Sequence, residues 1–342
     1  MINFFKNLKT FIHFKKNEKL FKRIIFNENL NTKKYLDEII KFDKKFTCLI
    51  SLQNLDNLNL NNTKYFYFDN NFIISIFFIF LKIRYLYTST PDLNNSIFRK
   101  SIYKKTKYIY IQHSPVSLCM IYKHNAFVNF DCIQVVNKNQ NSDVSDINKF
   151  YNKNIKTIKS KYLFLNNLKN NKINKLSEKI DYLIAPTWNT NFYELNFHKY
   201  IFDILDKHNK SYIFRPHYMS IKNKEFEIKN INIDRNRIDL SPSFNFENFR
   251  NLITDWSGIY LEFLIIKRKK PILFNSKMKV RNNNYKKYSL SPIELELRSS
   301  LANQFDLDEL DKFSKYINKS IINDNLSEND FKDKIRSKFY NI

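Results

Sequence analysis

The sequence predicts an α/β protein with two parallel-sheet domains. Short apolar runs alternate with helix-length segments, the alternation stops in a polar Asn- and Lys-rich stretch at 159–177, and it then starts again. A chain of 342 residues also exceeds one ordinary hydrophobic core, which favours two domains. Hydrophobic residues make up 43% of the chain, so both domains can have packed interiors.

The first 26 residues are expected to form a basic amphipathic segment. Phe4, Phe5, Leu8, Phe11 and Ile12 recur at helical spacing, with lysines between them. Such a helix either lies on an anionic membrane surface or packs on the rest of the protein, and the sequence leaves both interpretations open. Because no secretory signal is visible, we expect a cytoplasmic protein, with a peripheral position on the inner face of the cell membrane left open.

The N-terminal domain is expected to span residues 27–165. Its candidate strands are Phe46–Ser51, Lys64–Phe68, Arg84–Ser89, Lys107–Gln112 and Asp131–Val136. Helix-length segments at Asn71–Ile83 and Ser145–Ile155 lie between and after them. The apolar run Phe72–Leu81 is about half as long as a membrane span requires, so it is interpreted as a buried helix.

The C-terminal domain is expected to span residues 178–325, with the remaining tail free to pack back. Its candidate strands are Asp181–Pro186, Ser211–Pro216, Ile238–Ser241, Leu252–Thr254 and Lys270–Phe274. Helices are expected near Thr190–His208, near Asn245–Asn251 and from Gly258 onward. No internal repeat is visible.

The net charge of +25 has two interpretations. It reflects either a general Lys and Asn bias that coats the surface, or an anionic partner such as a membrane or a phosphorylated substrate. Nucleic acid is not expected, because the basic residues are spread out and no RNA-binding signature is present. The three cysteines, Cys48, Cys119 and Cys132, are scattered, which indicates neither a disulfide framework nor a zinc site.

Polar residues gather where the predicted strands end. Ligands of open parallel sheets bind beyond the carboxyl ends of the strands, so residues at these points are candidates for a site. They are His113 and Ser114, Thr187, Arg215 and His217, and the run from Asp255 through Ser257 to Gly258. Each one alone is explained as a turn or capping residue, but their joint occurrence on one edge favours a binding site.

Gly258 is the only glycine of the chain. Ser257 is expected to cap the helix that starts there, and a glycine lets a phosphate approach the free amides of that helix. The alternative is a glycine required only for a positive φ angle or for tight packing. A single glycine cannot form a Walker A loop or a GxGxxG fingerprint, which excludes P-loop NTPases and ordinary dinucleotide oxidoreductases. The Asp306–Asp308 run, formally a metal pattern, fits a solvated helix face better.

Four segments resemble the CDP-glycerol glycerophosphotransferases, which prime or polymerise teichoic acid and related capsule chains. They are YIQHSPVSLCMIYKHNAF from Tyr110, YLIAPTWNTN from Tyr182, YIFRPHYM from Tyr212 and LITDWSGIYLEFLIIKRKKPILF from Leu252. The segments occur in the order in which the family has them.

The resemblance implies a GT-B fold, two Rossmann-like domains facing each other across a cleft. It also implies transfer of a polyol phosphate from a CDP-activated donor to a hydroxyl, with release of CMP. The resemblance also implies a role for each candidate residue. His113 would be the base near the acceptor, with Ser114 on the acceptor side, while His217 and Arg215 would contact the transferred phosphate. The donor would be bound by Thr187, Ser257 and Gly258 at the pyrophosphate, by Asp255, and by Glu262, which would approach the nucleotide ribose.

The leading hypothesis is therefore a transferase that moves glycerol phosphate, or a related alditol or sugar phosphate, to a lipid-linked or glycan acceptor in surface polysaccharide biosynthesis. Such chemistry requires no cofactor, and the sequence leaves the use of a divalent metal open. Two alternatives stay open. One is a GT-B glycosyltransferase that uses a nucleotide sugar, and the other is a basic protein that binds nucleic acid or membrane.

Overall fold

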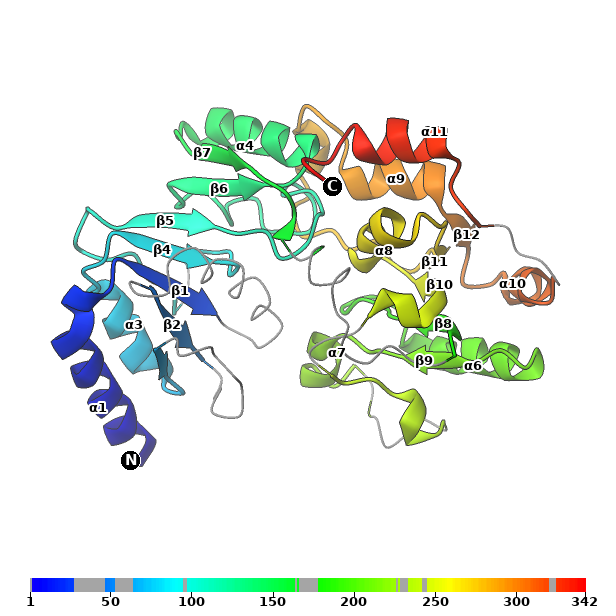
Figure 1. Ribbon diagram of the computed structural model, residues 1–342, viewed down its shortest axis with the longest axis horizontal. Helices are drawn as coiled ribbons and strands as arrows, with labels where there is room; N and C mark the ends of the chain where they lie inside the picture. The colour runs from blue at the N-terminus through cyan, green and yellow to red at the C-terminus, as the bar shows by residue number, and fades with distance from the viewer. Residues whose placement is uncertain are drawn as a thin grey trace.

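The protein consists of two α/β domains, each built on a parallel sheet (Figure 1). The computed structural model describes residues 2–27, 47–52, 64–94, 97–163, 165, 178–225, 227, 233–241, 245–319 and 324–342. Two parallel-sheet domains were predicted from the alternation of apolar and helix-length segments, and this prediction is confirmed. Parallel sheets are covered on both faces, which explains the nearly continuous apolar strands.

The N-terminal domain contains a seven-stranded sheet in the order β3-β2-β1-β4-β5-β6-β7. Its strands are β1 (Arg23–Asn27), β2 (Thr47–Ser51), β3 (Tyr65–Tyr67), β4 (Tyr85–Thr88), β5 (Lys107–Tyr110), β6 (Cys132–Val135) and β7 (Lys156–Lys159). Its α-helices are α1 (Ile2–Asn17), α3 (Asn71–Ile79) and α4 (Lys138–Tyr151). All described strand pairs of this sheet are parallel.

Helix α3 is the buried helix that the run Phe72–Leu81 predicted. The Asn70 side chain accepts hydrogen bonds from the backbone N–H groups of Phe72 and Ile73, which fixes the start of the helix. Ile74 and Phe77 are fully buried. Helix α1 packs against α3 and β3 through Phe14, whose ring is fully buried and lies 4.8 Å from that of Phe77.

The C-terminal domain contains a five-stranded sheet in the order β12-β11-β10-β8-β9. Its strands are β8 (Ile180–Ile184), β9 (Tyr212–Phe214), β10 (Phe249–Thr254), β11 (Ile272–Phe274) and β12 (Asn303–Phe305). Its α-helices are α6 (Phe197–Lys207), α7 (Tyr218–Lys222), α8 (Ile259–Lys267), α9 (Ile293–Leu301) and α10 (Leu310–Ile317), and the tail contains α11 (Glu328–Asp330).

Two predicted elements of this domain differ from the structure. The strand expected at Ile238–Ser241 is a single bridge between Ile238 and Phe214. The helix expected near Asn245–Asn251 is a 3₁₀ turn at Phe246–Asn248, because β10 already begins at Phe249 and takes the following residues into the sheet.

The two domains meet through polar contacts. Residues after β5 contact the first residues of α9: the Ser117 N–H donates to Glu294 Oε2 at 2.9 Å, and the Ser117 hydroxyl accepts from the Ile293 N–H at 2.8 Å. The chain also returns to the N-terminal domain at its end, where the Tyr340 N–H donates to the Val136 carbonyl at 2.9 Å. These contacts set the segment after β5 against the start of α9.

Candidate active site

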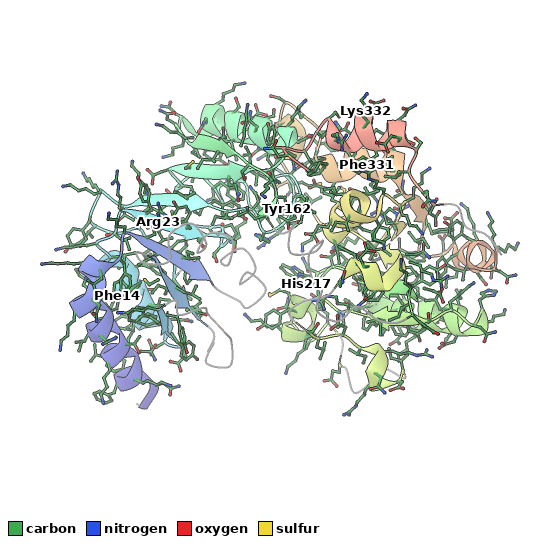
Figure 2. The ribbon with its side chains drawn as sticks, in the orientation of Figure 1. Phe14, Arg23, Tyr162, His217, Phe331 and Lys332 are labelled. Carbon is green, nitrogen blue, oxygen red and sulfur yellow. The ribbon has the colours of Figure 1, made fainter. Side chains whose placement is uncertain are left out.

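The candidate site lies where the carboxyl end of β5 faces the C-terminal domain, and it contains both predicted histidines. His113 follows β5 and His217 follows β9. The two imidazoles are close enough that the charge of His113 lowers the pKa of His217, and Lys279 lowers the pKa of both rings. In Figure 2 Tyr162 and His217 lie near the middle of the molecule, where the domains face each other.

His113 is held between two tyrosine hydroxyls. The Tyr110 hydroxyl lies 3.1 Å from Nδ1 of His113, and the Tyr122 hydroxyl lies 3.4 Å from Nε2. Burial, together with the positive charge of Lys279, lowers the pKa of His113 to about 4, against an opposing hydrogen bond to the Ser89 backbone. The ring is therefore neutral near pH 7 and able to accept a proton.

His217 stands at the start of α7 and has a defined tautomer. Its Nδ1 accepts a hydrogen bond from the Met219 N–H at 3.0 Å, so in the neutral ring the proton is on Nε2. Burial lowers the pKa of His217 to about 3, and the charges of Lys279, His113 and Arg215 act in the same direction. A neutral imidazole with a protonated Nε2 is a hydrogen-bond donor suited to a phosphate oxygen.

Lys279 is a site residue that the sequence did not indicate. Its Nζ lies 3.3 Å from the Thr187 hydroxyl and 4.1 Å from the centre of the Trp188 ring. The Trp188 ring in turn lies 6.2 Å from the His217 ring. Burial lowers the pKa of Lys279 to about 8, while Asp255 raises it. Lys279 was not predicted, because it lies five residues beyond the end of β11, whereas only residues directly after strands were candidates.

Asp255 is buried and accepts hydrogen bonds from the residues after β8 and β11. It has no exposed surface. Its Oδ1 accepts from the Thr187 N–H at 2.7 Å, and its Oδ2 accepts from the hydroxyls of Thr190 at 2.9 Å and Ser276 at 3.1 Å. The structure thus gives Asp255, which was expected at a donor-binding position, the contacts of a residue that positions Thr187.

Arg215 is close to the histidines but is engaged in an ion pair. Its Nη1 lies 2.6 Å from Asp239 Oδ2, and its Nη2 donates to the Ser241 carbonyl at 2.8 Å. The guanidinium was expected to neutralise phosphate charge. These two contacts hold the guanidinium in a fixed position, and its contact with a phosphate stays a prediction.

The start of α8 differs from the prediction in one respect. Ser257 was expected to cap the helix, but Gly258 occupies the N-cap position with φ −62° and no side-chain cap hydrogen bond. The prediction of a Ser257 cap is therefore wrong, and a positive φ does not explain the glycine. A helix start without a side-chain cap retains amides that favour an anion.

Gly258 makes a close contact between the domains. A Cβ at this position would lie 2.4 Å from the Ser114 Oγ and 2.9 Å from the Val116 Cγ1, both from the segment after β5. The tight-packing alternative therefore has direct support, since no other residue fits here without movement. Ser114, expected on the acceptor side, is thus brought next to the predicted pyrophosphate turn.

Glu262 joins the two domains through Tyr162. The Tyr162 hydroxyl lies 2.7 Å from Glu262 Oε1 and 2.9 Å from the carbonyl oxygen of His113. Both side chains are buried, with exposures of 6% for Glu262 and 1% for Tyr162. The contact of Glu262 with a nucleotide ribose stays a prediction.

Among the described residues, no group of three His, Cys, Asp or Glu side chains could hold a metal ion, and this includes the Asp306–Asp308 run. Within the same part of the chain, no helix has both the length and the apolar character needed to cross a bilayer.

The two parallel-sheet α/β domains give the protein a fold of the GT-B class, with two Rossmann-like domains. The solved structures similar to it include the wall teichoic acid polymerase TagF. A TagF variant with a histidine replaced by alanine has a TM-score of 0.53 and 14% sequence identity, over 93% of this chain and 88% of that chain. A second TagF structure has a TM-score of 0.50 and 14% identity, over 80% and 77%. No family model and no curated protein matches the sequence.

Proposed function

We propose that the protein transfers glycerol phosphate, or a related alditol or sugar phosphate, from a CDP-activated donor to a hydroxyl of a lipid-linked or glycan acceptor. CMP is released, and the product belongs to surface polysaccharide synthesis at the inner face of the cell membrane. One observation carries the proposal: two neutral imidazoles and the Lys279 ammonium gather beside a helix start without a side-chain cap.

In the proposed reaction the acceptor oxygen forms a bond to the phosphorus that carries the transferred group. The bond from that phosphorus to the bridging oxygen breaks, and CMP leaves with the bridging oxygen. The acceptor proton passes to the unprotonated nitrogen of neutral His113; this assigns the proton to Nε2, which faces only the more distant Tyr122 hydroxyl at 3.4 Å, whereas Nδ1 has Tyr110 at 3.1 Å. The Nε2–H of His217 and the charge of Lys279 stabilise the negative charge on the phosphate oxygens.

The pKa of His113 is low in the protein without donor, and a bound donor is expected to raise it. A pKa of about 4 makes the imidazole a weak base. The diphosphate of a bound donor adds negative charge beside the ring, and a nearby opposite charge favours the protonated imidazole. His113 therefore becomes a stronger base only when donor is bound, which limits proton transfer in its absence.

Lys279, Thr187 and Trp188 are assigned to the diphosphate in this proposal. The Lys279 ammonium has its hydrogen-bond partner Thr187 and the Trp188 ring on one side, and no carboxylate makes an ion pair with it among the described residues. Ser257 and Gly258 contribute backbone amides to the same anion. Arg215 acts at longer range through its charge.

The test is incubation with CDP-glycerol and an acceptor glycan, with CMP release as the readout. Acceptor-dependent CMP formation supports the proposal. If no CDP-alditol gives it, the proposal fails. A parallel binding screen of UDP-, GDP-, CMP- and CDP-linked donors separates this activity from a nucleotide-sugar glycosyltransferase, which would prefer a nucleotide sugar over every CDP-alditol.

A further inference from the structure

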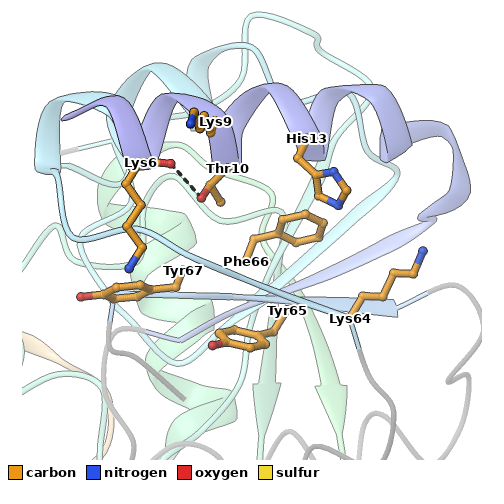
Figure 3. A pocket seen from close by; sticks show the side chains of 8 residues that line it. All are labelled: Lys6, Lys9, Thr10, His13, Lys64, Tyr65, Phe66 and Tyr67. Atoms are coloured by element: carbon orange, nitrogen blue, oxygen red, sulfur yellow. Dashed lines mark hydrogen bonds between the residues drawn. The ribbon is translucent and has the colours of Figure 1, made fainter. Parts of the chain in front are cut away.

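A second basic site lies far along the sheet from His113, between α1 and the strand β3. The cavity there has a volume of about 570 Å³ and opens to the surface. Its lining comes from one face of α1, from β3 and from the residue just before β3: Lys6, Lys9, Thr10, His13, Lys64, Tyr65, Phe66 and Tyr67 (Figure 3). Strand β3 is at the end of the strand order of the sheet, and β5, which leads to His113, is four positions away.

The lining of this cavity carries positive charge without a carboxylate. Lys6, Lys9 and Lys64 supply three ammonium groups, and His13 adds an imidazole. No described acidic side chain forms an ion pair with any of the three lysines. Asp69, which lies beyond β3, is engaged by the Asn7 side chain. A concave surface with several ammonium groups and tyrosine hydroxyls is suited to a phosphate group.

The cavity borders an outward face of α1 that alternates apolar and basic residues. Phe5, Lys9, Ile12 and Lys16 are separated by four, three and four positions, which sets them on one side of a helix. Phe5 is 57% exposed and Ile12 is 46% exposed. Lys9 belongs both to this face and to the cavity. Exposed apolar side chains beside ammonium groups are typical of a helix that lies in a membrane interface.

We propose that the cavity between α1 and β3 binds the phosphate of an anionic phospholipid headgroup. Phe5 and Ile12 then enter the boundary of the acyl chains, while Lys6, Lys9 and Lys64 surround the phosphate. A free phosphate would fit the charge but would leave the two exposed apolar side chains in water. The lipid satisfies both features, so we assign the site to a lipid rather than to a soluble phosphate.

This site uses no residue of the proposed transferase chemistry. Its failure would leave the transferase proposal intact, and the reverse also holds. The two are separated by measuring CMP release with a water-soluble acceptor, which variants of the lipid site should leave unchanged.

The experiment is sedimentation of the full chain with phosphatidylcholine vesicles that contain or lack phosphatidylglycerol. The Lys6→Ala/Lys9→Ala/Lys64→Ala variant is expected to bind the anionic vesicles at least about tenfold more weakly than the original protein. The matched control is Lys138→Ala/Lys153→Ala/Lys156→Ala, three exposed lysines at the β7 end of the same sheet. This control removes the same number of positive charges. Its vesicle binding is expected to stay within about twofold of the original, since salt screens charges that are far from the membrane contact.

Three further measurements complete the test. Phe5→Ala/Ile12→Ala is expected to weaken vesicle binding and to make the remaining binding more sensitive to salt. If the alanine triple variant does not fold, Lys6→Gln/Lys9→Gln/Lys64→Gln removes the charge and keeps most of each side chain. Titration calorimetry with glycerol phosphate tests whether a soluble phosphate, instead of a lipid headgroup, binds in the cavity.

The proposal is overturned if the pocket variant binds like the original, or if both triple variants lose the same amount. It is also overturned if glycerol phosphate binds at this cavity while anionic vesicles do not.

Discussion

The hydroxyl of Tyr162 lies 2.7 Å from a carboxylate oxygen of Glu262, so one buried hydrogen bond joins the segment after β7 to helix α8. The same hydroxyl lies 2.9 Å from the carbonyl oxygen of His113. Tyr162 thus touches both the backbone of the proposed base and the helix at the proposed phosphate site. The two domains are aligned at the residues where the chemistry is proposed to occur.

Replacement of Tyr162 by Phe tests this alignment. The change removes the hydroxyl that lies within hydrogen-bond distance of Glu262 and of the His113 carbonyl, which costs roughly 1–3 kcal/mol of unfolding free energy. We expect a lower midpoint in urea and a fall in turnover larger than any rise in KM. The control Tyr200→Phe removes a hydroxyl from a side chain that is 51% exposed and should change neither. Equal effects of both variants would contradict the assigned function of Tyr162.

The two histidines are expected to be required for transfer. His113→Ala and His217→Ala should each lower kcat by at least about a hundredfold, in line with the contribution of acid–base groups. His124→Ala is the matched control, because His124 is exposed and lies in the same segment after β5. A variant that retains the original rate of CMP release would remove that histidine from the mechanism.

Lys279→Met is expected to weaken donor binding and to shift the pH profile. The Lys279 charge disfavours protonated His113 and His217, so its removal raises the pKa of both rings. Activity that requires neutral His113 is lost below its pKa, and the acid limb of kcat/KM therefore moves to higher pH. Lys279→Arg should restore part of the affinity, and the exposed Lys277→Met should change neither quantity. An unchanged acid limb in Lys279→Met would contradict this electrostatic coupling.

Gly258→Ala is expected to destabilise the contact between the domains. The φ of −62° suits alanine, so the effect comes from the Cβ that meets Ser114 Oγ and Val116 Cγ1. Overpacking of this kind costs about 1–3 kcal/mol. Ser114→Ala removes the nearest atom and should recover part of that loss in a double-mutant cycle of urea midpoints. Additive effects of the two changes would show that the contact is not the cause.

The stability of the domain interface is expected to depend on pH through Asp143. Burial raises the pKa of Asp143 to about 8, and nearby Glu294 raises it too, against a hydrogen bond from the Leu118 N–H. The folded protein therefore holds this proton more tightly than the unfolded chain, and its contribution to stability is lost as pH rises from near 4 through 8.

Asp143→Asn should remove this dependence, because the amide oxygen still accepts from Leu118 and carries no charge. At pH 8.5 its melting temperature should exceed that of the original by at least about 2 °C. At pH 5 the difference in melting temperature between Asp143→Asn and the original protein should be smaller. Asp203→Asn, at an exposed position on α6, is the control. A parallel pH dependence in Asp143→Asn and the original protein would exclude Asp143 as the source.

The sequence allowed the strands near the site to be predicted, because buried parallel strands are apolar over their whole length. The strands before His113, Thr187 and His217 were found in this way. Strand β1 was missed, since Arg23 and the lysines before it made its residues look like the end of the amphipathic segment. Strand β7 was missed because two of its four residues are lysines at the edge of the sheet.

The pairing of side chains within the site could not be predicted from strand ends. Tyr162 follows β7, a strand that was not predicted, and Lys279 lies five residues beyond β11. Only the packing of separate segments brings these side chains to His113 and Thr187. The function of Gly258 in domain contact was likewise hidden, because Ser114 is distant in sequence. Local patterns report local backbone geometry, whereas these contacts depend on how separate segments meet.

The return of the chain end to the N-terminal domain restricts how the halves can move. The Tyr340 N–H donates to the Val136 carbonyl, and Phe339 forms a β-bridge with Asn137. These contacts add to those that Ser117 and Tyr162 make between the domains, so a chain that ended before Phe339 would lose one of the attachments that resist their separation.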